Sequence, residues 1–240
     1  MLGRENLERF TKLQQTSTQN VVREYCQHLF LSYLYQNPNS EKLLFKGGTA
    51  LRIILKSPRF SEDLDFTGAG ITHKEIEELF TNTLANIEKT GMAVNVTEAK
   101  QTTGGYLGIA SFEAYNMKIN VQIEVSLRSR KNFKKTRTLI TSDYLPAYTL
   151  VHLSLDDIIL GKLEALLARH KPRDFYDYFF LLSGDYSTAR TKENLKKVLK
   201  LLRKESINFQ TELKKFLPMS HTMHLRDFKR ILEQKILTYL

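Results

Sequence analysis

Several features that would fix a protein's class are scarce or missing in this 240-residue chain. A single cysteine, Cys26, means that no disulfide can form within it, which suits a reducing compartment. No apolar run reaches the roughly 18 residues that a membrane-spanning helix needs. Residues 1–15 carry charges of both signs and no apolar stretch, unlike a secretory signal. We therefore expect a cytoplasmic protein without a membrane span.

Two common kinds of catalytic signature are also missing. The six histidines are scattered, and no H-x-E or C-x-x-C pattern accompanies them, so we expect no zinc. No G-x-S-x-G motif or Cys–His nucleophile pattern is evident. Any chemistry must therefore be sought among the carboxylates and the basic residues.

Positive charge is what the sequence has in excess. The formal net charge is +10, and residues 128–137 carry six Lys/Arg and no acid, while residues 190–240 carry 13 Lys/Arg against five Asp/Glu. A polyanion such as RNA selects clustered cations, because each phosphate contact releases a counterion. The alternative is a solvated basic surface that only aids solubility. Segregation of the charge favours the polyanion.

The first half of the chain shows both helical and strand patterns. Apolar residues recur at helical spacing over 17–35, and Thr72-x-x-Glu75 predicts a capping box that opens a helix reaching about residue 90. Short strands are expected at 43–45, feeding into two glycines, and at 64–66. A mixture of this kind indicates an α/β (α+β) fold with a mixed sheet flanked by helices.

The pattern becomes helical after about residue 150. We predict a helix to Arg169, a break at Pro172 and a second helix over 173–183. This gives a core domain over residues 1–150 and an all-helical C-terminal domain over 151–240. The second domain is expected to complete the active site and to contribute a basic surface.

Three acids are placed for metal binding. In a strand, Asp63 and Asp65 point to the same face, and two carboxylates on one face repel each other unless a cation joins them. Mg²⁺ takes oxygen ligands and shares its remaining positions with water and substrate phosphates. Residues 117–127 alternate as a strand, and Glu124 is the only acid on its polar face. We predict these three residues as metal ligands; the alternative is solvent-facing loop acids.

A glycine turn precedes the aspartates by less than 20 residues. Gly47 and Gly48 let backbone N–H groups approach a phosphate, and the N-terminus of the following helix adds partial positive charge. Thr49 offers a hydroxyl. The combination predicts a cradle for a triphosphate, although two glycines also suit an ordinary tight turn.

The stretch KGGTALRIILKSPRFSEDLDF, residues 46–66, resembles the first motif of the AbiEii/MenT-type toxins. These belong to the nucleotidyltransferase superfamily related to DNA polymerase beta. Their pattern is a GG or GS turn followed by R-x-S-x-D-L-D-F, which here begins at Arg59. The resemblance implies that Asp63 and Asp65 are metal ligands and that Ser61 lies near the site. We also predict Arg59 and Ser61 as nucleotide-binding residues.

Residues 156–182 resemble a second motif of the same family, K-x-x-A-x-x-x-R-x-K-x-R-D-x-x-D. The match implies that Lys162 contacts the triphosphate and that Asp177 is a further essential acid. We therefore predict Lys162 and Asp177, with Asp63 and Asp65, as catalytic residues. Arg173 is predicted to bind the nucleotide. The alternative is that Lys162, Arg173 and Asp177 form salt bridges between packed helices.

The resemblance implies an enzyme and its partners. We expect a metal-dependent nucleotidyltransferase that uses an NTP with Mg²⁺ or Mn²⁺ and belongs to a bacterial toxin–antitoxin pair. The acceptor it implies is RNA, at the 3′ end of tRNA, which would block aminoacylation, and a cognate antitoxin would be its protein partner. Transfer to a protein or small-molecule hydroxyl, or a non-catalytic module that binds nucleic acid, are the alternatives.

Overall fold

The computed structural model describes residues 2–127 and 133–240, so part of the basic segment predicted at 128–137 lies outside the described residues. The chain divides into two compact units. The first comprises residues 1–56 and 60–154, and the second comprises 57–59 and 155–240. Segment 57–59 therefore groups with the second unit although its sequence neighbours belong to the first. The division into a core domain over residues 1–150 and a helical C-terminal domain over 151–240 stays a prediction.

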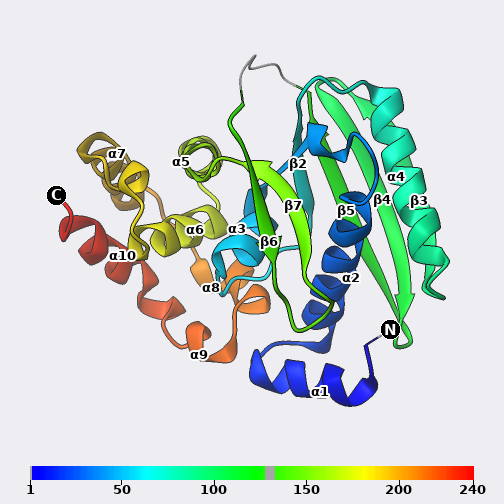
Figure 1. Ribbon diagram of the computed structural model, residues 1–240. Coiled ribbons are helices and arrows are strands. Elements are labelled where there is room, and N and C mark those ends of the chain that lie inside the picture. Colours follow the sequence, from blue (N-terminus) through cyan, green and yellow to red (C-terminus); the bar gives the residue numbers. More distant parts are fainter. Residues whose placement is uncertain (1, 128–132) are drawn as a thin grey trace. The chain divides into compact units, whose positions relative to one another are not determined.

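A seven-stranded sheet forms the centre of the first unit, in the order β3-β4-β5-β2-β1-β7-β6 (Figure 1). Its strands are β1 (Leu43–Lys46), β2 (Leu64–Gly68), β3 (Ala93–Thr102), β4 (Gly105–Ala114), β5 (Met117–Ser126), β6 (Lys135–Ile140) and β7 (Tyr148–Leu153). The pairs β1–β7 and β2–β5 are parallel, and the other neighbours are antiparallel. The predicted α/β class with a mixed sheet is confirmed.

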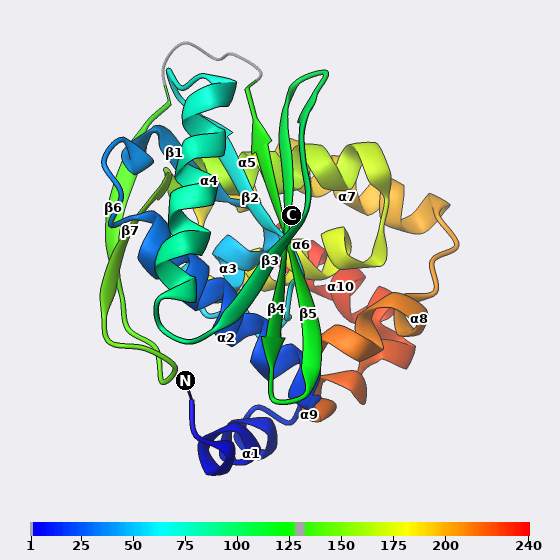
Figure 2. The ribbon, with the colours of Figure 1, turned by 90° about the vertical axis from the view of Figure 1, so that its right-hand side faces the viewer.

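The sequence predicts some of the strands more clearly than others. β5 alternates buried and more exposed positions along its length, as its sequence predicts. With β3 and β4 it forms a long antiparallel meander, which runs down the middle of Figure 2. β6 and β7 were not predicted, because the polar run of β6 lacks alternation and the buried run of β7 adjoins a helix.

Four α-helices lie among the described residues of the first unit. They are α1 (Arg4–Leu13), α2 (Thr18–Leu34), α3 (Gly47–Leu55) and α4 (His73–Glu88). The predicted capping box is present at the start of α4, where Thr72 and Glu75 each bond the other's backbone N–H. α2 and α4 pack against each other beside the sheet (Figures 1 and 2), and α3 packs on β1 and β2.

The described part of the second unit is built from helices and connecting segments. The α-helices are α5 (Leu155–Arg169), α6 (Pro172–Ser183), α7 (Lys192–Lys204), α8 (Phe209–Leu213), α9 (Met219–Thr222) and α10 (Phe228–Leu237). Pro172 opens α6 at a position where its missing N–H has no partner to lose. Aromatic rings hold the core of this unit: Phe209 lies edge-on to both Phe175 and Phe228, with ring centroids 5.9 and 4.9 Å away.

Candidate active site

The glycine turn is shaped around one of the predicted metal ligands. Gly47 follows β1 directly and opens α3 with φ of +84°, a conformation that L side chains rarely adopt. A Cβ at this position would overlap the carboxylate of Asp65. Position 47 therefore needs glycine for two reasons, its backbone angle and the closeness of Asp65.

Asp65 and Glu124 are brought together by strand register. In the parallel pair β2–β5, Asp65 lies directly opposite Glu124, and in the antiparallel pair β1–β2 it lies opposite Lys46. Residues directly opposite each other point to the same face of a sheet. The face inferred for Glu124 from strand alternation is therefore the face that carries Asp65, and Lys46 is an additional cation beside them.

These acids lie on the face turned away from α4. The ring of Phe80 in α4 packs edge-on against Tyr106 at 6.2 Å between centroids. Tyr106 is the partner of Val125, which is in turn the partner of Phe66. Because side chains alternate along a strand, Asp65 points to the opposite face from Phe66. The apolar side chains therefore lie on the face that α4 covers, and the acids lie on the other face.

Asp63 is held by its backbone just before β2 begins. The hydroxyl of Thr49 donates a hydrogen bond to the carbonyl oxygen of Asp63. The side-chain amide of Gln27 donates to the carbonyls of Ser61 and Glu62, both at 2.9 Å. Three consecutive carbonyls therefore accept hydrogen bonds from side chains of α2 and α3, which fixes the segment that leads into β2.

The donor chemistry of this group suits a hard divalent cation, because carboxylate oxygens are the ligands that Mg²⁺ prefers. Asp63 and Asp65 are half-buried and Glu124 is exposed, with one Glu124 oxygen accepting from Gln122 at 2.5 Å. Among the described residues, no three His, Cys, Asp or Glu side chains gather closely enough to enclose a metal. The pair on β2 and β5 therefore fits part of such a site, and Asp63 stays a predicted ligand.

The second unit contains a buried cluster of charges around Asp177. Arg59 donates from Nε and Nη2 to the two oxygens of Asp177, at 2.7 and 2.9 Å. The ammonium of Lys162 lies 2.8 Å from Oδ2 of the same carboxylate. The exposed fractions of the Arg59, Lys162 and Asp177 side chains are 4%, 11% and 1%. The cluster joins α5, α6 and the 57–59 segment.

The pKa of Asp177 reports which effect dominates in this cluster. Burial alone would raise its pKa, but the charges and hydrogen bonds of Arg59 and Lys162 outweigh burial and lower it to about 2. The carboxylate is thus ionised over the physiological range. A doubly paired, buried carboxylate is well suited to hold Lys162 and Arg59 in fixed positions.

Other charges of the second motif are paired within the same unit. Arg169 bonds the buried Asp174 at 2.6 Å, and Arg173 lies 3.5 Å from Glu212. Salt bridges between packed helices, the alternative interpretation of Lys162, Arg173 and Asp177, are therefore present. Functional roles for Lys162, Arg173 and Asp177 stay predictions, and salt bridges do not contradict them.

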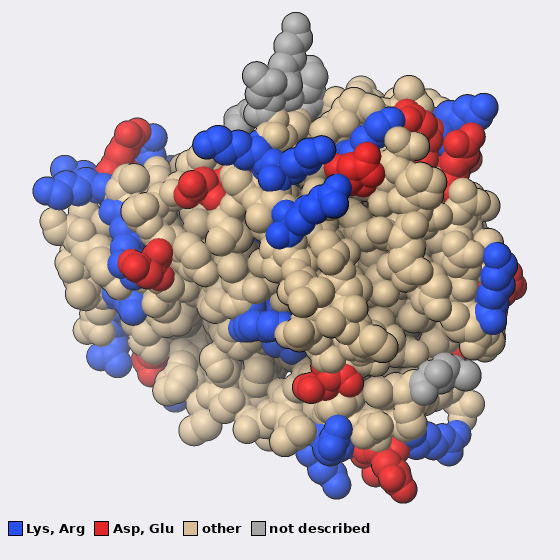
Figure 3. Space-filling model, viewed as in Figure 1, with Lys and Arg blue, Asp and Glu red and all other residues tan. Residues whose placement is uncertain are grey.

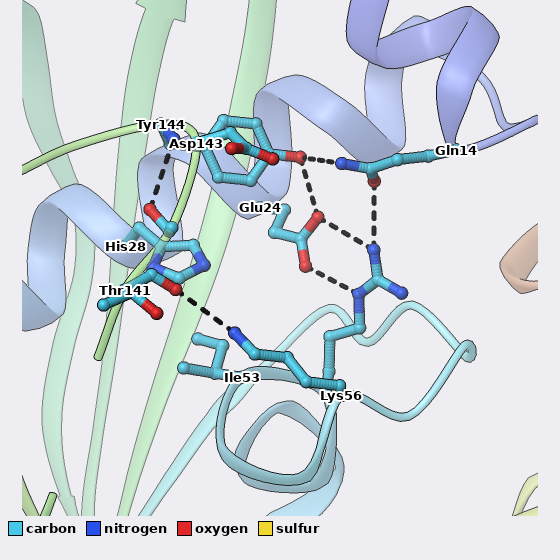
Figure 4. Close-up of a pocket in the computed structure, with 10 residues that line it drawn as sticks. Gln14, Glu24, His28, Ile53, Lys56, Thr141, Asp143 and Tyr144 are labelled. Atoms are coloured by element: carbon cyan, nitrogen blue, oxygen red, sulfur yellow. Dashed lines mark hydrogen bonds and ion pairs between the residues drawn. The ribbon is translucent and has the colours of Figure 1, made fainter. Parts of the chain in front are cut away.

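A pocket of about 430 Å³ lies elsewhere in the first unit, between α2, α3 and residues 141–144 (Figure 4). At its centre Arg52 bonds Glu24 at 2.6 Å, and Tyr144 donates to the same carboxylate at 2.8 Å. None of the predicted site residues lines it. The paired charges link α3 to α2 and stabilise the frame on which the glycine turn is built.

Comparison with known protein families decides the class. The family described as nucleotidyl transferase AbiEii toxin, type IV toxin–antitoxin system, matches residues 29–237. This chain belongs to that family. Membership makes it a nucleotidyltransferase, and the resemblance seen in the two motifs is confirmed. Comparison with curated proteins gave no match.

Solved structures of other proteins share the fold. MenT4, a nucleotidyltransferase toxin from Mycobacterium tuberculosis H37Rv, is 17% identical with a TM-score of 0.65, and the match covers 100% of this chain and 91% of MenT4. JHP933 from Helicobacter pylori is 17% identical with a TM-score of 0.56, covering 93% of this chain and 95% of JHP933. At this identity the likeness speaks for the fold alone. Over residues 2–127 and 133–240, no helix is long and apolar enough to cross a membrane.

Two residues near the AbiEii motifs escaped the sequence analysis. Lys46 opens the K-G-G stretch, yet only strand pairing shows that it lies opposite Asp65. Gln27 lies in a helix more than 30 residues before the carbonyls it holds, and no local pattern in the sequence identifies this role.

Proposed function

We propose that this AbiEii-family toxin transfers a nucleoside monophosphate from an NTP to the 3′-terminal hydroxyl of tRNA. The hydroxyl loses its proton and attacks the α-phosphorus, a new P–O bond forms, and the bond to the pyrophosphate oxygen breaks. Pyrophosphate leaves with the electron pair. A tRNA with an added nucleotide cannot be aminoacylated, which arrests translation.

One observation carries the proposal, the placement of Asp65 against Gly47 and opposite Glu124. Asp63, Asp65 and Glu124 hold Mg²⁺ or Mn²⁺ in this proposal. A divalent ion there would neutralise charge on the triphosphate and favour ionisation of the attacking hydroxyl. The backbone N–H groups of Gly47 and Gly48 bind phosphate oxygens, and Ser61 lies beside them.

The hydroxyl of Thr49 was predicted to contribute to the triphosphate cradle, and we now assign it another role. Its side chain is buried and donates to the Asp63 carbonyl. We assign it to holding the Asp63 segment, while its backbone N–H, in the first turn of α3, remains a candidate phosphate donor.

The charged residues of the second motif support the transfer. Lys162 contacts the triphosphate and neutralises charge on the leaving pyrophosphate. Asp177 acts by fixing the positions of Lys162 and Arg59, to which it is bonded. Arg59 and Arg173 supply positive charge for the nucleotide. A cognate antitoxin in the bacterial cytoplasm would keep the activity in check.

The direct test is transfer of label from each of the four α-labelled NTPs to purified tRNA, with Mg²⁺, with Mn²⁺ and with chelator. We expect label on tRNA with one or a few nucleotides, and none with chelator. Periodate-oxidised tRNA, which lacks the 3′-terminal diol, is the matched control and should accept nothing. Parallel reactions with total protein and small-molecule fractions identify other acceptors, and label on those fractions alone would rule out tRNA.

A further inference from the structure

Four lysines form a regular row along α7. Lys192, Lys196, Lys200 and Lys204 follow one another at intervals of four residues over the whole length of the helix. Residues four apart are neighbours on a helix surface. At 1.5 Å rise per residue, the row extends for about 18 Å. It is therefore a continuous stripe of ammonium groups.

The row is exposed, and acids elsewhere on the unit do not neutralise it. All four side chains are exposed. The only acid on α7, Glu193, pairs with Lys197 at 2.6 Å, and Glu233 pairs with Arg203 at 2.7 Å. Over the described chain none of the four row lysines forms an ion pair. The two other cations of α7 are occupied, and the row retains its charge.

The rest of α7 anchors the row. Leu195, Val198, Leu199 and Leu202 are buried in the second unit. Since these apolar residues fasten the opposite side of the helix, the lysines are held outward. Figure 3 shows Lys and Arg side chains gathered at the left-hand edge, over α7.

We propose that this row, the α7 lysine row, binds the sugar-phosphate backbone of the RNA acceptor. The proposal rests on the proposed function, which supplies RNA as the substrate class. Evenly spaced point charges on flexible stems suit a chain of phosphates and read no base edges, so contact is independent of sequence. The row would give affinity and leave base selection to other residues.

The composition of the row argues against other partners. Protein interfaces are depleted in lysine and enriched in aromatic residues, and the row contains lysine alone. A membrane-surface helix must expose its apolar side to lipid, whereas the apolar side of α7 is buried. A polyphosphate chain is what remains, and RNA is the polyphosphate that the reaction requires.

The test compares two variants with equal loss of charge. One changes the row, K192Q/K196Q/K200Q/K204Q, and the control changes four exposed lysines of the first unit, K74Q/K89Q/K100Q/K118Q. The Kd for a fluorescent, unstructured oligoribonucleotide and for tRNA is measured against salt concentration. Each phosphate contact to a single strand contributes about −0.7 to the slope of log affinity against log salt. Four contacts predict a slope smaller by about 3 and roughly hundredfold weaker binding near 0.15 M salt in the row variant.

The control variant should keep the slope and affinity of the wild type, and an equal loss in both variants would overturn the proposal. Unchanged RNA binding by the row variant would also overturn the proposal. So would a row variant that keeps its RNA binding and loses binding only to an acidic protein. In transfer assays, the row variant should show a raised KM for tRNA with an unchanged kcat. If the melting temperature of the quadruple variant is below that of the wild type, the double variants K192Q/K200Q and K196Q/K204Q replace it. Each should then show about half of the change in the salt slope.

Failure of this inference is distinguishable from failure of the proposed function. D65N should bind RNA with wild-type affinity and salt slope while transferring nothing. If the wild type bound RNA through the row but no NTP gave labelled tRNA, the surface would stand and the proposed reaction would fall.

Discussion

Asp65 in the first unit and Asp177 in the second differ in nearly every physical respect, although both lie in motifs of the same family. Asp65 is half-buried, close against a glycine backbone and opposite another acid. Asp177 is 1% exposed and bonded to two cations. One environment brings two acids and Lys46 together on one face of a sheet, and the other neutralises a single negative charge inside a helical core.

The difference suggests two kinds of contribution to one activity. Asp65 and Glu124 carry like charges on neighbouring strands, and a divalent cation that joined them would offset the repulsion between them, so this pair suits a ligand-binding role. A fully paired carboxylate contributes to the frame, because removing it would leave buried cations without a partner. Substitution can separate these contributions. Changing Asp65 should affect transfer with little effect on stability, whereas changing Asp177 should lower stability as well as transfer.

The largest effect is expected from D65N. Asparagine keeps the size of the side chain and removes its charge, so transfer should fall by at least about a thousandfold, several kcal/mol of transition-state stabilisation. The melting temperature should stay close to that of the wild type, because the size of the side chain is preserved. Initial rates of label transfer and thermal melts measure both. Retained turnover would remove Asp65 from the catalytic group.

D177N should lower stability, and it should also reduce transfer, because Lys162 loses the carboxylate that fixes its position. Removing the charge leaves Arg59 and Lys162 uncompensated in a buried site, which costs roughly 3–5 kcal/mol. Urea unfolding followed by circular dichroism measures the loss. The matched control is D185N, whose exposed carboxylate bonds Arg190 at 3.2 Å and should contribute at most about 1 kcal/mol. Wild-type stability in D177N would show that the cluster is not part of the frame.

The same substitution predicts a pH dependence. The pKa of Asp177 is lowered to about 2 from an ordinary value of 3.8, so its contribution is complete above pH 4 and is lost as pH falls toward 2. The stability difference between wild type and D177N should therefore narrow below about pH 4. Urea titrations from neutral pH down to pH 3 follow it. A difference that widened on acidification would have the wrong sign for a lowered pKa.

G47A tests the contact between the turn and Asp65. Alanine at this position suffers from the positive φ and also overlaps the Asp65 carboxylate, which must move. A displacement near 1 Å can cost about a hundredfold in rate. G91A is the control, because Gly91 has nearly the same φ of +83° and open space around it. Transfer should fall in G47A only, whereas both variants lose some stability.

A smaller effect is expected from Q27M. Methionine resembles glutamine in size and removes both donors to the carbonyls of Ser61 and Glu62, so the segment before Asp63 loosens. We expect about a tenfold loss of kcat/KM, comparable to one hydrogen-bonding contribution of about 1.4 kcal/mol. Q36M, which loses an exposed bond to Ser32, should resemble the wild type. Equal activity of Q27M and wild type would assign Gln27 to packing alone.

Local patterns predicted the elements that build the acidic face. Alternation identified β5 and the phase of Glu124, because one face of that strand is buried and the other is not. The Thr72 capping box fixed the start of α4, since both partners are three residues apart. The strand before the glycines and the one after Asp63 were also predicted. In each case the deciding contacts are close in sequence.

Long-range pairing accounts for what the sequence could not provide. Asp63 lies before the strand that was expected to contain it, and its position depends on Thr49 and on a helix far upstream. The ion pair between Arg59 and Asp177 joins residues that are 118 positions apart in the sequence, and no local pattern of charge identifies it. β7 pairs in parallel with β1 more than 100 residues away, which periodicity alone does not reveal.

The assignment of Arg59 to the second unit has a consequence for dissecting the protein. A fragment beginning at Leu155 would contain Asp177 and Lys162 but would lack the guanidinium that occupies two of the carboxylate's bonds. The backbone passes between the units at 56/57, 59/60 and 154/155, so a single cut cannot release them intact. The helical half is thus completed by three residues inserted from within the sequence of the other half.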